Sequence, residues 1–161
     1  MSPKSLLRHK GANADLHELT DGRFESVLVD PRVEDPNAVK RLVLCSGKVF
    51  HDIEAREERE SMADLAVARI EMIYPFPTEA VGQMVDAYPN LESVTWVQEE
   101  PRNMGAWSFV ARRINDLLPE GLSLRYAGRP RRASPSEGYP QAHQVEQERL
   151  VLDALNITSG D

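Results

Sequence analysis

The sequence predicts an α/β fold in which parallel strands alternate with helices. Three short runs are apolar at consecutive positions, which is typical of strands buried on both faces of a parallel sheet. Apolar residues at helical spacing follow each run. The order strand–helix, repeated four times, predicts right-handed helical crossovers between neighbouring strands.

Four strands are expected. Residues 42–45, 65–68 (extended by Ile70) and 94–97 are the buried runs, whereas residues 122–126 alternate between apolar and polar and so predict a half-exposed edge strand. The expected helices cover residues 49–60, 77–88, 104–118 and 141–155. Pro89 and Pro119 end the second and third helices, and the third carries the most regular apolar stripe.

The 161 residues, 41% of them hydrophobic, are enough for one core. We expect one α/β domain over residues 41–161 and a connecting segment over residues 1–40, where prolines and glycines interrupt every pattern. Within that segment, residues 16–19 could form a helical turn and residues 24–29 a strand, and residues 33–37 are expected to be an exposed loop.

The net charge of −7 argues against nucleic-acid binding over the whole surface. No apolar run approaches the ~18 residues that span a bilayer, so neither nucleic acid nor membrane is expected as a partner. Cys45 is the single cysteine, which fits a reducing compartment, and its apolar strand predicts a buried, unreactive thiol. These features predict a cytoplasmic protein.

Three segments follow strand ends, where open parallel sheets bind ligands. In the first, Gly47 would let backbone amides approach an anion beside Ser46 and Lys48, although a tight turn with a solvated lysine is the simpler interpretation. In the second, Glu99 and Glu100 could hold a cation or transfer protons, but a structural role at the start of the next helix is preferred.

The third segment is basic. Residues 121–136 contain four arginines and no Asp or Glu, and Arg129, Arg131 and Arg132 lie close together after the last strand. Guanidinium forks bind phosphates and carboxylates, so we favour anion binding here. A solvated loop, or pairing with an acidic partner surface, are the alternatives.

No catalytic constellation is evident. The chain lacks a phosphate-binding GxxxxGK[ST] loop, an HExxH metal motif and a GxSxG nucleophile turn. His143 and Glu146 are three residues apart on an expected helix, but a solvated helix face is preferred over a metal site. We therefore predict no catalytic, cofactor-binding or metal-binding residue in this chain. Trp107 is expected in the core or an interface.

Three segments, MSPKSLLR at 1–8, LCSGKV at 44–49 and WVQEEPRNMGAW at 96–107, resemble the carboxyl-terminal region of the thiamine-dependent decarboxylating component of 2-oxoglutarate dehydrogenase. Supporting pieces lie at 73–77, 128–135 and 143–147. The resemblance implies a doubly wound three-layer α/β/α domain of the transketolase C-terminal type. Its sheet would have about five strands, mostly parallel with one antiparallel strand. It also implies that Met1 is an internal position of a longer protein.

The family is a homodimer that uses thiamine diphosphate and Mg²⁺ to decarboxylate 2-oxoglutarate in the citric acid cycle. It transfers the succinyl group to the lipoyl arm of dihydrolipoamide succinyltransferase. Its cofactor residues lie mostly in two preceding domains, so the resemblance implies that this chain alone is inactive. In bacterial relatives the domain supports dimer assembly.

The same domain binds a nucleotide-type effector, AMP or acetyl-CoA, in relatives. Lys48, Gln98 and the pair Arg131 and Arg132 match that site, and Ser46 and Arg129 flank them. Pro130 followed by two arginines departs from relatives and bears on which effector binds. A stand-alone phosphate- or nucleotide-binding module is the alternative function.

Overall fold

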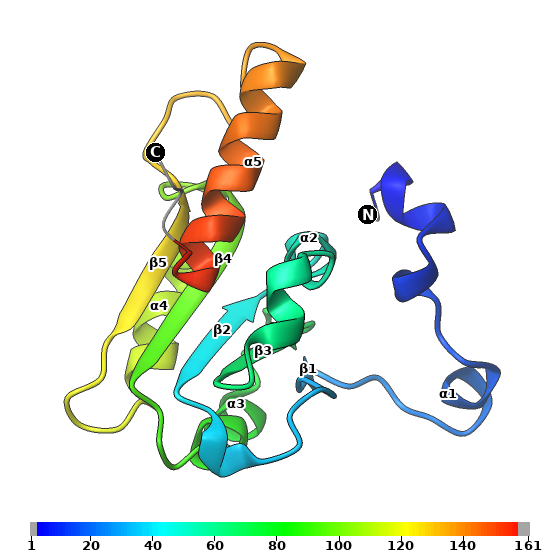
Figure 1. The fold of residues 1–161 in the computed structure, drawn as a ribbon, viewed down its shortest axis with the longest axis vertical. Helices are drawn as coiled ribbons and strands as arrows, with labels where there is room; N and C mark the ends of the chain where they lie inside the picture. Colours follow the sequence, from blue (N-terminus) through cyan, green and yellow to red (C-terminus); the bar gives the residue numbers. More distant parts are fainter. Residues whose placement is uncertain (1–2, 158–161) are drawn as a thin grey trace.

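Five strands form one sheet at the centre of the computed structural model, which describes residues 3–157 (Figure 1). The spatial order is β1-β3-β2-β4-β5, and only β1 is antiparallel to its neighbour. The strands are β1 Val27–Leu28, β2 Arg41–Cys45, β3 Leu65–Ile70, β4 Ser93–Pro101 and β5 Leu124–Arg129. The expected mostly parallel sheet of five strands with one antiparallel strand is confirmed, and β5 is an edge strand as the alternating pattern predicted.

Consecutive residues of the central strands pack on opposite faces of the sheet, which explains why these strands are apolar throughout. Leu42 and Leu44 of β2 face α3 and α4, whereas Val43 and Cys45 face α2 and α5. The helices are α2 Val49–Glu54, α3 Thr78–Asp86, α4 Trp107–Asn115 and α5 Pro140–Leu155. Two helices therefore cover each face, giving the three-layer α/β/α arrangement (Figure 1).

Several elements differ in length from the prediction: α3 and α4 are shorter at both ends than expected, and the changes in β4 and β5 affect the site. The helix expected over 49–60 stops at Glu54 and continues as a 3₁₀ turn, Glu57–Ser61. Strand β4 runs on to Pro101, past an irregularity in its pairing with β5 between Val97 and Pro101. Strand β5 includes Arg129, so this residue lies in the sheet and not in a loop as expected.

Residues 3–25, before β1, extend away from the sheet on one side (Figure 1). They contain two 3₁₀ turns, Lys4–Arg8 and Lys10–Ala12, and the short helix α1 Leu16–Thr20, which confirms the helical turn expected at 16–19. Nearly every residue from 3 to 25 is exposed. A further 3₁₀ turn, Pro36–Ala38, falls in the region expected to be an exposed loop. The first two residues of the MSPKSLLR segment lie outside the described residues.

Candidate functional site

The three strand ends singled out in the sequence meet at one edge of the sheet. Strands β2, β4 and β5 are parallel neighbours, so the turns that follow them lie side by side. A cavity of about 310 Å³ opens at this edge, lined by Ser46, Lys48, Gln98 and Glu99 among others. The structure therefore brings together the predicted residues of β2 and β4.

Gln98 organises the turn after β4. Its side chain is 4% exposed, and its Oε1 accepts hydrogen bonds from Trp96 Nε1 (3.0 Å) and the backbone amide of Trp107 (2.9 Å). Its Nε2 lies 2.8–3.3 Å from three backbone carbonyls between residues 100 and 104. Gln98 thus caps the first turn of α4, the role expected of Glu99 and Glu100. Its amide is committed to the turn itself.

Lys48 is paired with carboxylates and is not a free cation. Its Nζ contacts Asp52, one helical turn along α2, and lies 3.9 Å from Glu99 Oε1. The expected solvated lysine is therefore wrong, because two acids neutralise it. Ser46 lines the same cavity and is half-buried.

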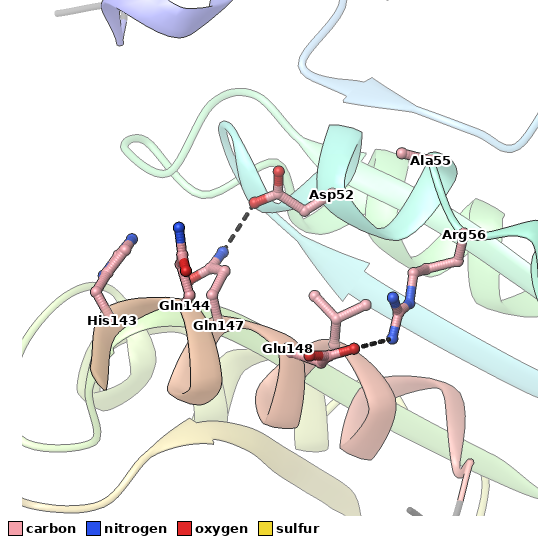
Figure 2. Close-up of a pocket in the computed structure, with 8 residues that line it drawn as sticks. Asp52, Ala55, Arg56, His143, Gln144, Gln147 and Glu148 are labelled. Carbon is pink, nitrogen blue, oxygen red and sulfur yellow. Dashed lines mark hydrogen bonds and ion pairs between the residues drawn. The ribbon is translucent and has the colours of Figure 1, made fainter. Parts of the chain in front are cut away.

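Gln147 on α5 joins the two halves of the site. Its Nε2 donates to Asp52 Oδ2 (2.8 Å) and to Glu99 Oε1 (2.9 Å), and its Oε1 accepts from Arg129 Nη2 (3.2 Å). Figure 2 shows the Gln147–Asp52 contact between α5 and α2. The Gln147 side-chain amide thus connects Asp52 of α2 and Glu99 of β4 to Arg129 of the basic segment.

A second hollow lies between α2 and α5 (Figure 2). Its volume is about 380 Å³, and Arg56 and Glu148 face each other across it at 3.3 Å. His143, Gln144 and Gln147 line the other end. Since its charges are paired across the groove, this hollow offers no concentrated field for an ion.

Arg129 is buried within the network, with 4% of its surface exposed. One terminal nitrogen donates to the Glu99 carbonyl, and the other lies 3.2 Å from both His143 Nδ1 and Gln147 Oε1. Its Nε, 3.4 Å from Glu137 Oε1, has no hydrogen-bond partner. Arg129 is therefore a buried strand residue and not part of an exposed loop, and its Nε is the donor of this guanidinium that remains without a partner.

The neighbouring arginines differ from one another. Arg132 is 32% exposed; its guanidinium pairs with Glu137 and lies 3.6 Å from Glu146 Oε2, and its amide donates to Asn103 Oδ1 (3.0 Å). Arg131 is exposed and makes no ion pair with the residues that the structure describes. The positive field expected across the basic segment is therefore largely neutralised by acids that follow it.

His143 and Glu146 do not form a metal pair, and neither belongs to a purely solvated helix face. Glu146 contacts Arg132 and accepts a hydrogen bond from Arg149 Nη2 (3.1 Å), which holds the pKa of Glu146 below its usual value. Over residues 3–157, no three His, Cys, Asp or Glu side chains converge so as to hold a metal ion. The described residues by themselves do not fit a magnesium–diphosphate group.

Cys45 and Trp107 occupy the places that the sequence predicted. Cys45 is fully buried, and burial raises the pKa of its thiol. Trp107 packs against the core at the start of α4, with its ring centroid 4.9 Å from that of Tyr126 and the Arg102 guanidinium 5.5 Å from it.

Three residues of the network were missed. Asp52 could have been found, because it lies four residues after Lys48 on an expected helix, a spacing that pairs opposite charges. Glu137 stands one residue beyond the acid-free stretch, and Gln147 belongs to a distant helix. The sequence carries no local signal that either of these two would turn back to the arginines.

Comparisons with known proteins identify the chain. The 2-oxoglutarate dehydrogenase C-terminal family model matches residues 13–155. Similar proteins, each named 2-oxoglutarate dehydrogenase E1 component, come from Shouchella clausii (45% identity, 96% of this chain), Geobacillus kaustophilus (47%, 96%) and Azotobacter vinelandii (44%, 98%). The chain spans only 16–17% of the length of these relatives. No helix in residues 3–157 is long and apolar enough to cross a membrane. The chain belongs to the 2-oxoglutarate dehydrogenase C-terminal family.

Proposed function

We propose that this chain acts as the C-terminal part of a 2-oxoglutarate dehydrogenase E1 component in the bacterial cytoplasm. The observation that carries the proposal is 44–47% identity to E1 components over 96–98% of the chain. The whole enzyme would decarboxylate 2-oxoglutarate with thiamine diphosphate and Mg²⁺. It would then pass the succinyl group to the lipoyl arm of dihydrolipoamide succinyltransferase.

Within that enzyme, the chain serves assembly and regulation. The α/β domain of residues 41–161 packs in a homodimer, and residues 1–40 connect it to the preceding polypeptide. Tyr74, which is exposed beside Phe109 at a ring distance of 6.1 Å, and Arg113, stacked 3.8 Å from the Phe109 ring, support an interface on this side of α4. Aromatic and arginine side chains are enriched at such interfaces.

The edge site binds a nucleotide-type effector, AMP or acetyl-CoA. Arg131 is exposed and makes no ion pair with the described residues, and Arg132 lies next to it, partly exposed. Guanidinium groups bind phosphate oxygens through paired hydrogen bonds. Ser46, Lys48 and Gln98 shape the adjoining cavity, and Arg129 fixes its far wall through Glu99.

Calorimetric titration of the 161-residue chain with AMP and with acetyl-CoA tests the site. We expect binding that is lost when Arg131→Ala is combined with Arg132→Ala. The matched control replaces two other strongly exposed arginines, Arg23→Ala with Arg112→Ala, and should bind as the wild type does. Binding that survives the first double substitution would overturn the site assignment.

The assignment of catalysis to the rest of the enzyme has its own test. The isolated chain, supplied with thiamine diphosphate, Mg²⁺ and 2-oxoglutarate, should release no CO₂ above the buffer rate. Grafting the chain onto the upstream part of a relative's E1 component should restore decarboxylation. Turnover by the chain alone, or an inactive but folded and dimeric graft, would contradict the proposal.

A further inference from the structure

The Glu137 carboxylate lies between the buried Arg129 and the partly buried Arg132. Both oxygens of Glu137 contact Arg132 Nη1, and Oε1 lies 3.4 Å from Arg129 Nε. The Glu137 side chain is 10% exposed. An acid from the connection between β5 and α5 thus turns back onto the arginines that precede it.

The arginines nevertheless have an unused donor. Arg129 commits its two terminal nitrogens to Glu99, His143 and Gln147, while its buried Nε has no hydrogen-bond partner. A buried donor without an acceptor is unfavourable. The Arg129 Nε–H and the Glu137 carboxylate attract each other by charge, but they do not form a hydrogen bond. Glu137, together with Glu146 at 3.6 Å from Arg132, therefore balances the charge of the two guanidinium groups but leaves Arg129 Nε without a hydrogen bond.

A phosphate group supplies what Glu137 lacks. It carries up to two charges and three terminal oxygens, so it can accept from Arg129 Nε and from Arg132 at the same time. The connection that holds Glu137 is exposed over residues 133–136. Displacing the carboxylate would not require the sheet or α5 to move.

We propose that Glu137 is an internal competitor for the anion site: it occupies the arginines in the free protein, and a phosphate monoester must displace it to bind. This inference rests on the proposed effector site and adds its regulation. Glu137 then sets the affinity of the site for anions. Dianionic phosphates should bind better than monocarboxylates, because exchanging the Glu137 carboxylate for another carboxylate adds no charge and no hydrogen bond.

The experiment titrates AMP, inorganic phosphate and adenosine into the wild-type chain and into Glu137→Gln. Removing the competing charge should tighten AMP binding about tenfold, which corresponds to ~1.4 kcal/mol. Inorganic phosphate should gain by a similar factor if the phosphate group alone is recognised. Adenosine, which lacks the phosphate, should gain nothing. Glu137→Ala should reproduce the gain, and adding Arg132→Gln should abolish it.

Glu148→Gln is the matched control, since it removes one carboxylate that pairs with Arg56 and not with the arginines of the basic segment. An equal gain in Glu148→Gln would reveal a general charge effect and overturn the inference. If AMP binds the wild type and Glu137→Gln with the same affinity, the role of Glu137 is also overturned, whereas the proposed effector site is retained. Absence of AMP binding in every variant would reject both.

A second measurement does not depend on how the variants fold. In the wild type, the Nε–H resonance of Arg129 should shift when AMP is added, because that proton gains an acceptor. The Arg129 resonance should shift with inorganic phosphate as well. An unchanged resonance at saturating AMP would show that the ligand does not reach the Glu137 position.

Discussion

At the scale of single residues, the site depends on close packing between the ends of β4 and β5. Gly128 is the tightest point: a Cβ there would lie 2.6 Å from the Tyr126 hydroxyl and 2.8 Å from the Gln98 carbonyl oxygen. The Tyr126 hydroxyl in turn donates toward the carbonyls of Glu100 and Arg129. Even one added methyl group would push these turns apart.

Gly128→Ala should therefore lower the free energy of unfolding by about 1–3 kcal/mol, the usual cost of overpacking. Urea unfolding followed by circular dichroism measures the change. Gly138→Ala is the control, because no atom lies within 4 Å of its added Cβ. Its stability should stay equal to the wild type or rise slightly, through lower unfolded-state entropy. Equal losses in the two variants would contradict the packing argument.

At the scale of elements, a buried ion pair fastens the segment before β2 to the domain. Asp30, just after β1, contacts Arg59 of the 3₁₀ turn Glu57–Ser61 and accepts a hydrogen bond from the backbone amide of Val67 in β3 (2.8 Å). Both charged side chains are almost fully buried. Arg59 also lies 3.3 Å from Glu54 at the end of α2. The Asp30–Arg59 pair therefore links the residues after β1 to β3, to the 3₁₀ turn and, through Arg59, to the end of α2.

Asp30→Asn should destabilise the chain by about 3 kcal/mol, since removing one partner leaves the other charge buried and poorly compensated. The urea midpoint reports the change. Asp35→Asn, an identical substitution at an exposed position of the same segment, should leave the midpoint near that of the wild type. If both variants unfold alike, the pair does not hold the segment.

The elements also show what sequence patterns can and cannot predict. The buried strands and the four helices were predictable because apolar runs and helical spacing are local properties. The extension of β4 to Pro101 was not, because it depends on an irregular register against β5. Likewise, the burial of Arg129 depends on Gln147 and Glu137, which reach it only after α5 packs on the sheet.

At the scale of the whole molecule, stability should fall as the solution becomes mildly acidic. His51 on α2 is buried, and burial together with the charges of Arg69 and His9 holds its pKa below the usual value, against the opposite effect of Asp52 and Glu71. Near pH 6.5 the unfolded chain then binds more protons than the folded one, so stability rises with pH.

Urea midpoints should therefore decrease between about pH 7 and pH 5.5, on either side of the ordinary histidine pKa. His51→Phe, which keeps an aromatic ring beside Phe50, should flatten this part of the profile. His17→Gln, on the exposed helix α1, should keep the wild-type slope. A slope that persists in His51→Phe would assign the effect elsewhere.

The position of β5 at the border of the sheet has a consequence for solubility. An edge strand offers unpaired backbone groups, and a second chain can extend the sheet by adding a strand to them. Here Arg125, the second residue of β5, is exposed and pairs with Asp153 at 3.5 Å. A charged side chain at that point opposes strand addition. The edge strand that holds Arg129 in the site thus also opposes edge-to-edge pairing of sheets from separate molecules.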